Sequence, residues 1–158
     1  MKMKEMFNRR ATNEVILKAL TNLGVTLTTE DLKNHLIHCM MNKDHNPNLK
    51  KGIYNDVVYF IFLDSKLMKI GKVGGGIRCI KLRCNDYRSK GDPLGRKILK
   101  YIEEGYNVDI WALTMKQPNI SMYGIDNIQP CIGPSFEKIL INKARNVGYT
   151  LDWNANNG

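Results

Sequence analysis

The chain has 158 residues, of which 43% are hydrophobic and 8% aromatic, which is enough apolar material for one folded core and too much for a wholly disordered chain. Its 24 Lys and Arg side chains outnumber 15 acidic ones and give a net charge of +9. Such an excess concentrates polyanions around a protein, so nucleic acid is the expected partner. A basic protein without such a ligand is the alternative, because charge alone does not identify a ligand.

The location of the protein is predicted from two further features. The first ten residues lack the apolar run of a signal peptide, and no later stretch has about 18 uninterrupted apolar residues, as a membrane span would. The four cysteines, Cys39, Cys79, Cys84 and Cys131, show no C-x-x-C spacing. We therefore expect reduced thiols and a cytoplasmic protein.

The first fifty residues are predicted to be helical. Val15, Ile16, Ala19 and Leu20 recur at helical spacing before Gly24 ends the pattern. A second helix is expected from the hydroxyl cap at Thr28 through Met40, and the polar linker 46–55 follows it. This pattern predicts a helical N-terminal arm over residues 1–50 and a core over residues 51–158.

A β-hairpin opens the predicted core. Residues 57–63 form an apolar, β-branched and aromatic run, residues 64–66 form a polar turn, and residues 67–73 form a second strand. This register sets Leu63 opposite Leu67, Tyr59 opposite Gly71 and Ile61 opposite Lys69. Tyr59 and Lys69 then become diagonal neighbours on one face, about 7–8 Å apart.

The remaining elements follow from glycine, proline and capping positions. They are a helix over 77–89 after Gly74-Gly75-Gly76, a helix over 92–105, a strand over 107–115, an irregular segment over 116–133 and a last helix over 134–148. The sequence therefore predicts an α+β fold with a small, mainly antiparallel three-stranded sheet flanked by helices and preceded by the helical arm.

Four polar side chains are predicted to meet near the hairpin. Arg83 and Tyr87 lie four residues apart and hence on one face of the helix that follows, where they join Tyr59 and Lys69. A lysine in an apolar strand is otherwise typical of a sheet edge protected against aggregation, and this alternative stays open for Lys69.

With these residues in place, the sequence from about Val57 to Trp153 resembles the GIY-YIG nuclease family. Tyr59 is similar to the tyrosine of the first motif, and Lys69-Ile70-Gly71-Lys72 resembles the second motif with lysine in place of its tyrosine. A lysine at this position is similar to what the small type II restriction enzymes of the family have. The literal Gly52-Ile53-Tyr54 precedes the apolar run and lies too far from the second motif to be the signature.

The resemblance implies a site and an activity. Arg83 matches the family's helical arginine, with Arg78 as the alternative, Tyr87 matches the residue one turn later, and Glu137 matches the glutamate that binds metal, here expected to be Mg²⁺. The general base is either Tyr59 or Lys69. The substrate-binding residues implied are Lys72, Arg78, Arg88 and Asn154.

The implied function is metal-dependent, sequence-specific cleavage of double-stranded DNA by a homodimer, with residues 46–54 and 116–133 as candidate groove readers. Two alternatives stay open. One is a non-catalytic DNA-binding module that uses the N-terminal helices, and the other is a structure-specific repair or mobile-element nuclease.

Two further groups of polar residues carry weaker signals. His35, His38 and Cys39, with His45 beyond, could form a zinc site, but their spacing matches no recognised module and favours an amphipathic helix. The pair Arg9-Arg10 has two open interpretations, contact with the DNA backbone and no role at all.

Overall fold

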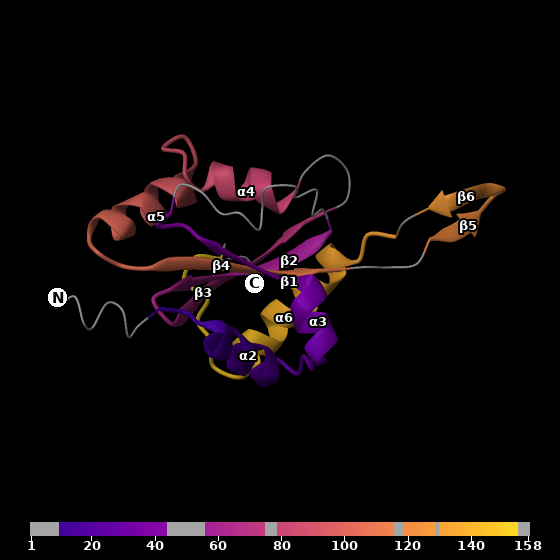
Figure 1. The fold of residues 1–158 in the computed structure, drawn as a ribbon, viewed down its shortest axis with the longest axis horizontal. Helices are drawn as coiled ribbons and strands as arrows, with labels where there is room; N and C mark the ends of the chain where they lie inside the picture. Colours follow the sequence, from indigo (N-terminus) through magenta and orange to yellow (C-terminus); the bar gives the residue numbers. More distant parts are fainter. Residues whose placement is uncertain (1–9, 44–55, 75–78, 116–118, 129, 155–158) are drawn as a thin grey trace.

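The protein is an antiparallel sheet with helices on both faces (Figure 1). A computed structural model describes residues 10–43, 56–74, 79–115, 119–128 and 130–154. In this part of the chain the helices are α2 (Asn13–Asn22), α3 (Thr29–His35), α4 (Ile80–Asp86), α5 (Pro93–Glu103) and α6 (Gly133–Asn146). The strands are β1 (Leu36–Met40), β2 (Val57–Leu63), β3 (Lys66–Val73), β4 (Val108–Thr114), β5 (Ile120–Met122) and β6 (Ile125–Ile128). None of the described helices has the length and apolar character of a membrane span.

The main sheet has the strand order β1-β4-β2-β3, so β3 forms one edge. Helices α4 and α5 cover one face, and α2 and α6 cover the other (Figure 1). Each face has its own core: Tyr59, Ile98 and Ile110 belong to the first, and Phe60 and Leu140 to the second. Both faces of the central strands are thus buried, which explains the continuous apolar runs in β2 and β4. The predicted α+β class is confirmed.

The prediction of a second helix running through Met40 is wrong. Helix α3 is fixed at its start by a capping box, in which Thr28 and Asp31 exchange hydrogen bonds, but it ends at His35. Leu36–Met40 then forms β1, paired antiparallel with β4, and the sheet has four strands instead of three. The alternation of burial along β1, with Ile37 and Cys39 inside, has the period of a strand. The first fifty residues therefore supply one strand of the sheet, and a domain boundary near residue 50 stays a prediction.

The register of the hairpin is confirmed around Tyr59. Tyr59 pairs with Gly71 and Ile61 with Lys69. The turn is shorter than predicted, because Leu63 pairs with Lys66 and not with Leu67. An irregularity between Ile61 and Phe62 takes up the extra residue, as a β-bulge does, so the error at the turn does not reach Tyr59.

The downstream elements follow the prediction with two differences. Helix α5, strand β4 and helix α6 lie where the sequence predicts them, whereas α4 is shorter than the predicted helix over 77–89. The segment 116–133 is not wholly irregular, because β5 and β6 form a separate two-stranded hairpin that extends away from the sheet (Figure 1). Tyr123 and Gly124 both have positive φ angles, 54° and 76°, as tight hairpin turns require.

The N-terminal arm is fastened to the sheet through Arg10. Its guanidinium lies 3.0 Å from Asp109 of β4, a fully buried carboxylate that also lies 2.6 Å from Nε2 of His38. The His38 ring stacks on Trp111 at 3.9 Å. Arg10 therefore has a structural partner.

His38 and Cys39 are neighbours in a strand and point to opposite faces, so the amphipathic helix expected for them is wrong.

Candidate active site

The candidate site lies at the β3 edge of the sheet, beside Tyr59. The Tyr59 side chain crosses from β2 over Gly71 of β3, and a Cβ added at Gly71 would overlap the ring and hydroxyl of Tyr59. Glycine is therefore required at position 71, because the phenol occupies the space of a side chain.

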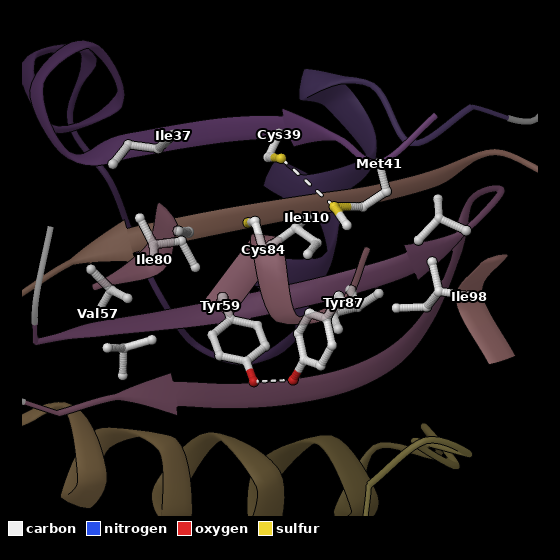
Figure 2. Close-up of a cluster of buried hydrophobic side chains, with 14 of the residues drawn as sticks. Ile37, Cys39, Met41, Val57, Tyr59, Ile80, Cys84, Tyr87, Ile98 and Ile110 are labelled. Carbon is white, nitrogen blue, oxygen red and sulfur yellow. Dashed lines mark hydrogen bonds between the residues drawn. The ribbon is translucent and has the colours of Figure 1, made fainter. Parts of the chain in front are cut away.

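Tyr59 and Tyr87 meet at their hydroxyl groups. The two oxygens lie 2.6 Å apart, one donating to the other, and the rings make an edge contact at 6.2 Å (Figure 2). Tyr87 ends α4, and its backbone N–H donates to the carbonyl of Arg83. Burial raises the pKa of Tyr59, and the neighbouring Tyr87 raises it further. Burial also raises the pKa of Tyr87, so both phenols are held protonated.

Lys69 is half-buried on the same face as Tyr59. Burial lowers the pKa of its ammonium group, and the charge of Arg83 lowers it further, whereas the charges of Glu137 and Asp92 act in the opposite direction. The charges of Arg83 and Glu137 therefore lie near enough to Lys69 to affect its pKa. A lysine with a lowered pKa is more readily deprotonated than one in solvent, so it can accept a proton.

One nitrogen of the Arg83 guanidinium is buried. Its Nε is enclosed and has no hydrogen-bond acceptor within the described ranges. An enclosed N–H without an acceptor costs free energy, and Arg10 and Arg88 have the same kind of unpaired Nε although their guanidinium groups bond to other protein atoms. The planar guanidinium suits the oxygens of a phosphate.

Glu137 reaches the site from the other face of the sheet, on the second turn of α6. Burial raises the pKa of its carboxyl group, and three lysines, Lys72, Lys69 and Lys138, act to lower it. Glu137 is thus a partly desolvated acid surrounded by cations. Tyr59 and Tyr87 are thus in contact, and Lys69, Arg83 and Glu137 lie near enough to affect the pKa of Tyr59 or of one another. A catalytic role for these five residues stays a prediction.

A buried aspartate fixes the start of α6 and thereby the position of Glu137. Helix α6 has Ile132 as its N-cap residue and no capping side chain of its own. Asp56 supplies the missing acceptor, because its carboxylate accepts the N–H groups of Gly133 at 2.6 Å and Ile132 at 3.1 Å. A Cβ on Gly133 would lie 2.6 Å from the same carboxylate, so the contact needs glycine.

The four predicted substrate-binding residues have different surroundings. Lys72 is exposed on β3 and acts on Glu137. Arg88 donates to the backbone carbonyl of Lys43 at 2.7 Å, beyond the end of β1, and the amide of Asn154 exchanges two hydrogen bonds of 2.9 Å with the backbone of Ile70. Arg78 lies outside the described residues, so only Arg83 is seen at the site. For all four, a role in substrate binding stays a prediction.

The fold is similar to that of a known nuclease, whereas the sequence alone matches no known family. No protein-family model and no curated protein matches the sequence. A solved structure of a mutant of EndoII of bacteriophage T4 covers 64% of this chain and 74% of its own, with 19% identity and a TM-score of 0.50. This match shows a shared fold. The restriction endonuclease Hpy188I in complex with product DNA covers 80% of this chain and 85% of its own, with 18% identity, but its TM-score of 0.36 is too low to support an argument.

Asp56 and Asp92 are the residues that sequence reasoning missed at the site. The sequence identifies Asp92 as the cap of α5, where it accepts the N–H of Gly95 at 2.8 Å, but its charge also acts on Lys69 and Tyr87. The sequence places Asp56 only at the start of a strand. A signal exists for it, because a helix that begins at Gly133-Pro134 without a capping side chain requires an acceptor from elsewhere.

Proposed function

We propose that the protein is a metal-dependent endonuclease of the GIY-YIG type that hydrolyses phosphodiester bonds in double-stranded DNA. The observation that carries this proposal is the convergence of two phenols, an amine, a guanidinium and a carboxylate at one sheet edge. The fold shared with EndoII and the net charge of +9 support it.

The substrate phosphate is held by cations. The planar guanidinium of Arg83 donates to phosphate oxygens, and Lys72, an exposed residue of β3, adds a second positive charge. These groups also stabilise the extra negative charge that accumulates on phosphorus when water attacks.

The directions of the pKa shifts favour Lys69 over Tyr59 as the proton acceptor for the attacking water. The pKa of Lys69 is lowered toward neutrality, whereas that of Tyr59 is raised away from it. Tyr59, oriented by Tyr87, then serves to position the water by a hydrogen bond. When the water oxygen bonds to phosphorus, one proton of the water passes to the neutral amine of Lys69. The opposite P–O bond breaks, and the leaving oxygen takes a proton from solvent to become an alcohol.

Glu137 fits the role of a Mg²⁺ ligand. Its carboxyl is the acid of the cluster, and Mg²⁺ is commonly bound by one or two carboxylates together with substrate phosphate oxygens and water. A half-buried carboxylate with a raised pKa gains from a nearby cation, which agrees with this role. When bound, the ion would supply charge neutralisation on the phosphate and the leaving oxygen.

The decisive test is cleavage of plasmid DNA with Mg²⁺, with and without a chelator. Metal-dependent fragments are expected, and Arg83→Ala and Glu137→Gln should each abolish them. Lys81→Ala, an exposed cation on the same helix as Arg83, and Glu14→Gln, an exposed acid on α2, are the matched controls and should cut normally. Band shifts without cutting by the wild-type protein would instead identify a non-catalytic binding module.

Within this activity we propose sequence-specific, restriction-type cutting by a cytoplasmic homodimer, since short palindromic sites suit two-fold symmetric proteins. Discrete fragments from mixed plasmid DNA and a dimeric mass in sedimentation equilibrium are the expected results. Preference for branched over linear duplex DNA would identify a structure-specific nuclease instead.

A further inference from the structure

A groove with cationic side chains lies next to the candidate site. It has a volume of about 640 Å³ and runs between α5, strand β3 and the C-terminal segment. Its walls include Met68, Arg96, Lys97, Lys100, Tyr101 and Trp153. None of the five residues proposed for catalysis lines it, so the groove is a separate surface.

Two chain segments connect the groove to the candidate site, one in β3 and the other at the start of α5. Met68 of its wall directly precedes Lys69, and the carbonyl of Met68 accepts the backbone N–H of Trp153 at 2.9 Å. Helix α5 begins at Asp92, whose charge acts on Lys69 and Tyr87. The groove and the candidate site are therefore neighbours along β3 and the start of α5.

The charges of the groove suit a polyanion. Arg96, Lys97 and Lys100 are exposed along consecutive turns of α5, and Arg96 is braced by a bond of 2.9 Å from Nη1 to the carbonyl of Lys90. Of the two acids in the lining, Asp152 is neutralised by Lys66 at 3.0 Å and Glu104 lies at the far end of α5. The end nearest the site is thus the more cationic one.

The aromatic floor favours a nucleotide chain over a simple anion. Tyr101 and Trp153 line the groove with ring centroids 5.7 Å apart, and Tyr101 is partly exposed. Cations beside an aromatic surface are the combination that binds the phosphates and the sugar or base faces of nucleic acid.

We propose that this groove binds the sugar–phosphate backbone of the DNA strand that runs away from the scissile phosphate. The inference rests on the proposed function for the position of that phosphate. Arg96, Lys97 and Lys100 contact successive phosphates and hold the duplex in register with Lys69 and Arg83, while Tyr101 packs against the sugars.

The test measures binding separately from cutting. A fluorescent duplex of about 30 base pairs, long enough for sliding and groove contacts, is titrated in chelator, and affinity is followed against salt concentration. The variant Arg96→Gln/Lys97→Gln/Lys100→Gln is compared with Lys18→Gln/Lys33→Gln/Lys143→Gln, which removes the same charge from exposed sites on α2, α3 and α6. Thermal unfolding of both variants verifies folding.

The groove variant is expected to bind at least tenfold more weakly and to reduce the salt slope by roughly 2–3, about 0.9 for each phosphate that is no longer neutralised. The charge-matched variant should change both quantities much less. Equal effects in the two variants, or displacement of the duplex by polyglutamate as efficient as by unlabelled duplex, would overturn the proposal.

Mg²⁺ then separates the two hypotheses. If wild-type protein binds through the groove but never cuts, the groove stands and the nuclease proposal fails. If wild-type protein cuts and the groove variant binds and cuts equally well, the nuclease proposal stands and the groove proposal fails.

Discussion

The hydroxyl oxygens of Tyr59 and Tyr87 lie 2.6 Å apart although the two residues come from different elements, a central strand and the end of a helix. Both side chains are almost fully buried, with exposed fractions of 2% and 4%. The bond therefore connects α4, which carries Arg83, to the hairpin that carries Lys69. A change in either phenol should affect the stability of the fold and the alignment of the site.

Tyr87→Phe is expected to lower the free energy of unfolding by about 1–3 kcal/mol, because the buried hydroxyl of Tyr59 loses its partner. The single-turnover cleavage rate should fall as well, since Tyr59 is no longer oriented. Urea unfolding and quenched-flow cleavage measure the two effects. In a double-mutant cycle with Tyr59→Phe, a coupling energy near zero would mean that the contact has no energetic consequence.

Gly71→Ala should disable the site through sterics alone. The added methyl group would overlap the ring of Tyr59, so the phenol must move or the strands must separate. Overpacking of this kind costs about 1–3 kcal/mol of unfolding free energy. Gly74→Ala is the matched control on the same chain segment, because a Cβ there meets only Cys131 at an ordinary 3.8 Å. Equal stability and equal cleavage by the two variants would contradict the proposed overlap.

Asp56→Ala is expected to lower both stability and activity, because two N–H groups at the start of α6 lose their charged acceptor. Hydrogen bonds to charged groups contribute about 1.5–3 kcal/mol each. Asp64→Ala is the comparison: Asp64 is also buried and also has a positive φ angle, but its carboxylate accepts the N–H of Asn107 at the other end of the hairpin. Only Asp56→Ala should slow cleavage at a temperature where both variants stay folded.

The sequence predicts the hairpin well because two independent constraints agree on its register. The apolar run fixes the buried strand, and the need for space opposite Tyr59 fixes Gly71. The length of the turn could not be predicted, because Asp64-Ser65-Lys66 is compatible with two or three turn residues. The bulge between Ile61 and Phe62 compensates for the difference.

The errors concern segments whose structure depends on distant partners. Leu36–Met40 has apolar residues that fit a helix or a strand, and pairing with β4, about seventy residues away, decides between them. Asp56 contacts Gly133 across a separation of 77 residues, so no local pattern reveals it. The position of Glu137 beside Lys69 likewise follows from α6 packing at the β3 edge, which spacing along the chain does not specify.

Glu137→Gln is expected to stabilise the fold at neutral pH while abolishing cleavage. Burial raises the pKa of Glu137 above its ordinary value of 4.5, so the folded protein disfavours the charged carboxylate. The wild-type protein therefore loses stability as the pH rises from about 4.5 through the raised folded-state pKa, and the penalty is complete above that range.

Thermal unfolding of both proteins in chelator, followed from about pH 4 to about pH 8, checks this. The variant should match the wild type at the acidic end and exceed it near neutrality. Glu14→Gln, in the exposed first turn of α2, removes the same charge and should change the unfolding temperature less than Glu137→Gln does near neutrality. A constant difference between Glu137→Gln and the wild type at every pH would contradict the assignment.

The β5–β6 hairpin is expected to contribute selectivity for DNA sequence without contributing to salt-dependent affinity. Residues 119–128 include no Lys or Arg and one acid, Asp126, so this stretch cannot neutralise phosphates. A two-stranded ribbon does fit the major groove, and Tyr123 at the turn is 95% exposed.

Replacing residues 119–128 by a short Gly-Ser linker should leave the main sheet folded, because in the part of the chain that the structure describes β5 and β6 pair only with each other. Discrete fragments should give way to a smear, while the slope of affinity against salt stays the same. Tyr123→Ser should weaken the fragment pattern in the same direction. An unchanged pattern together with a reduced salt slope would show the opposite, that the segment binds the backbone and reads no bases.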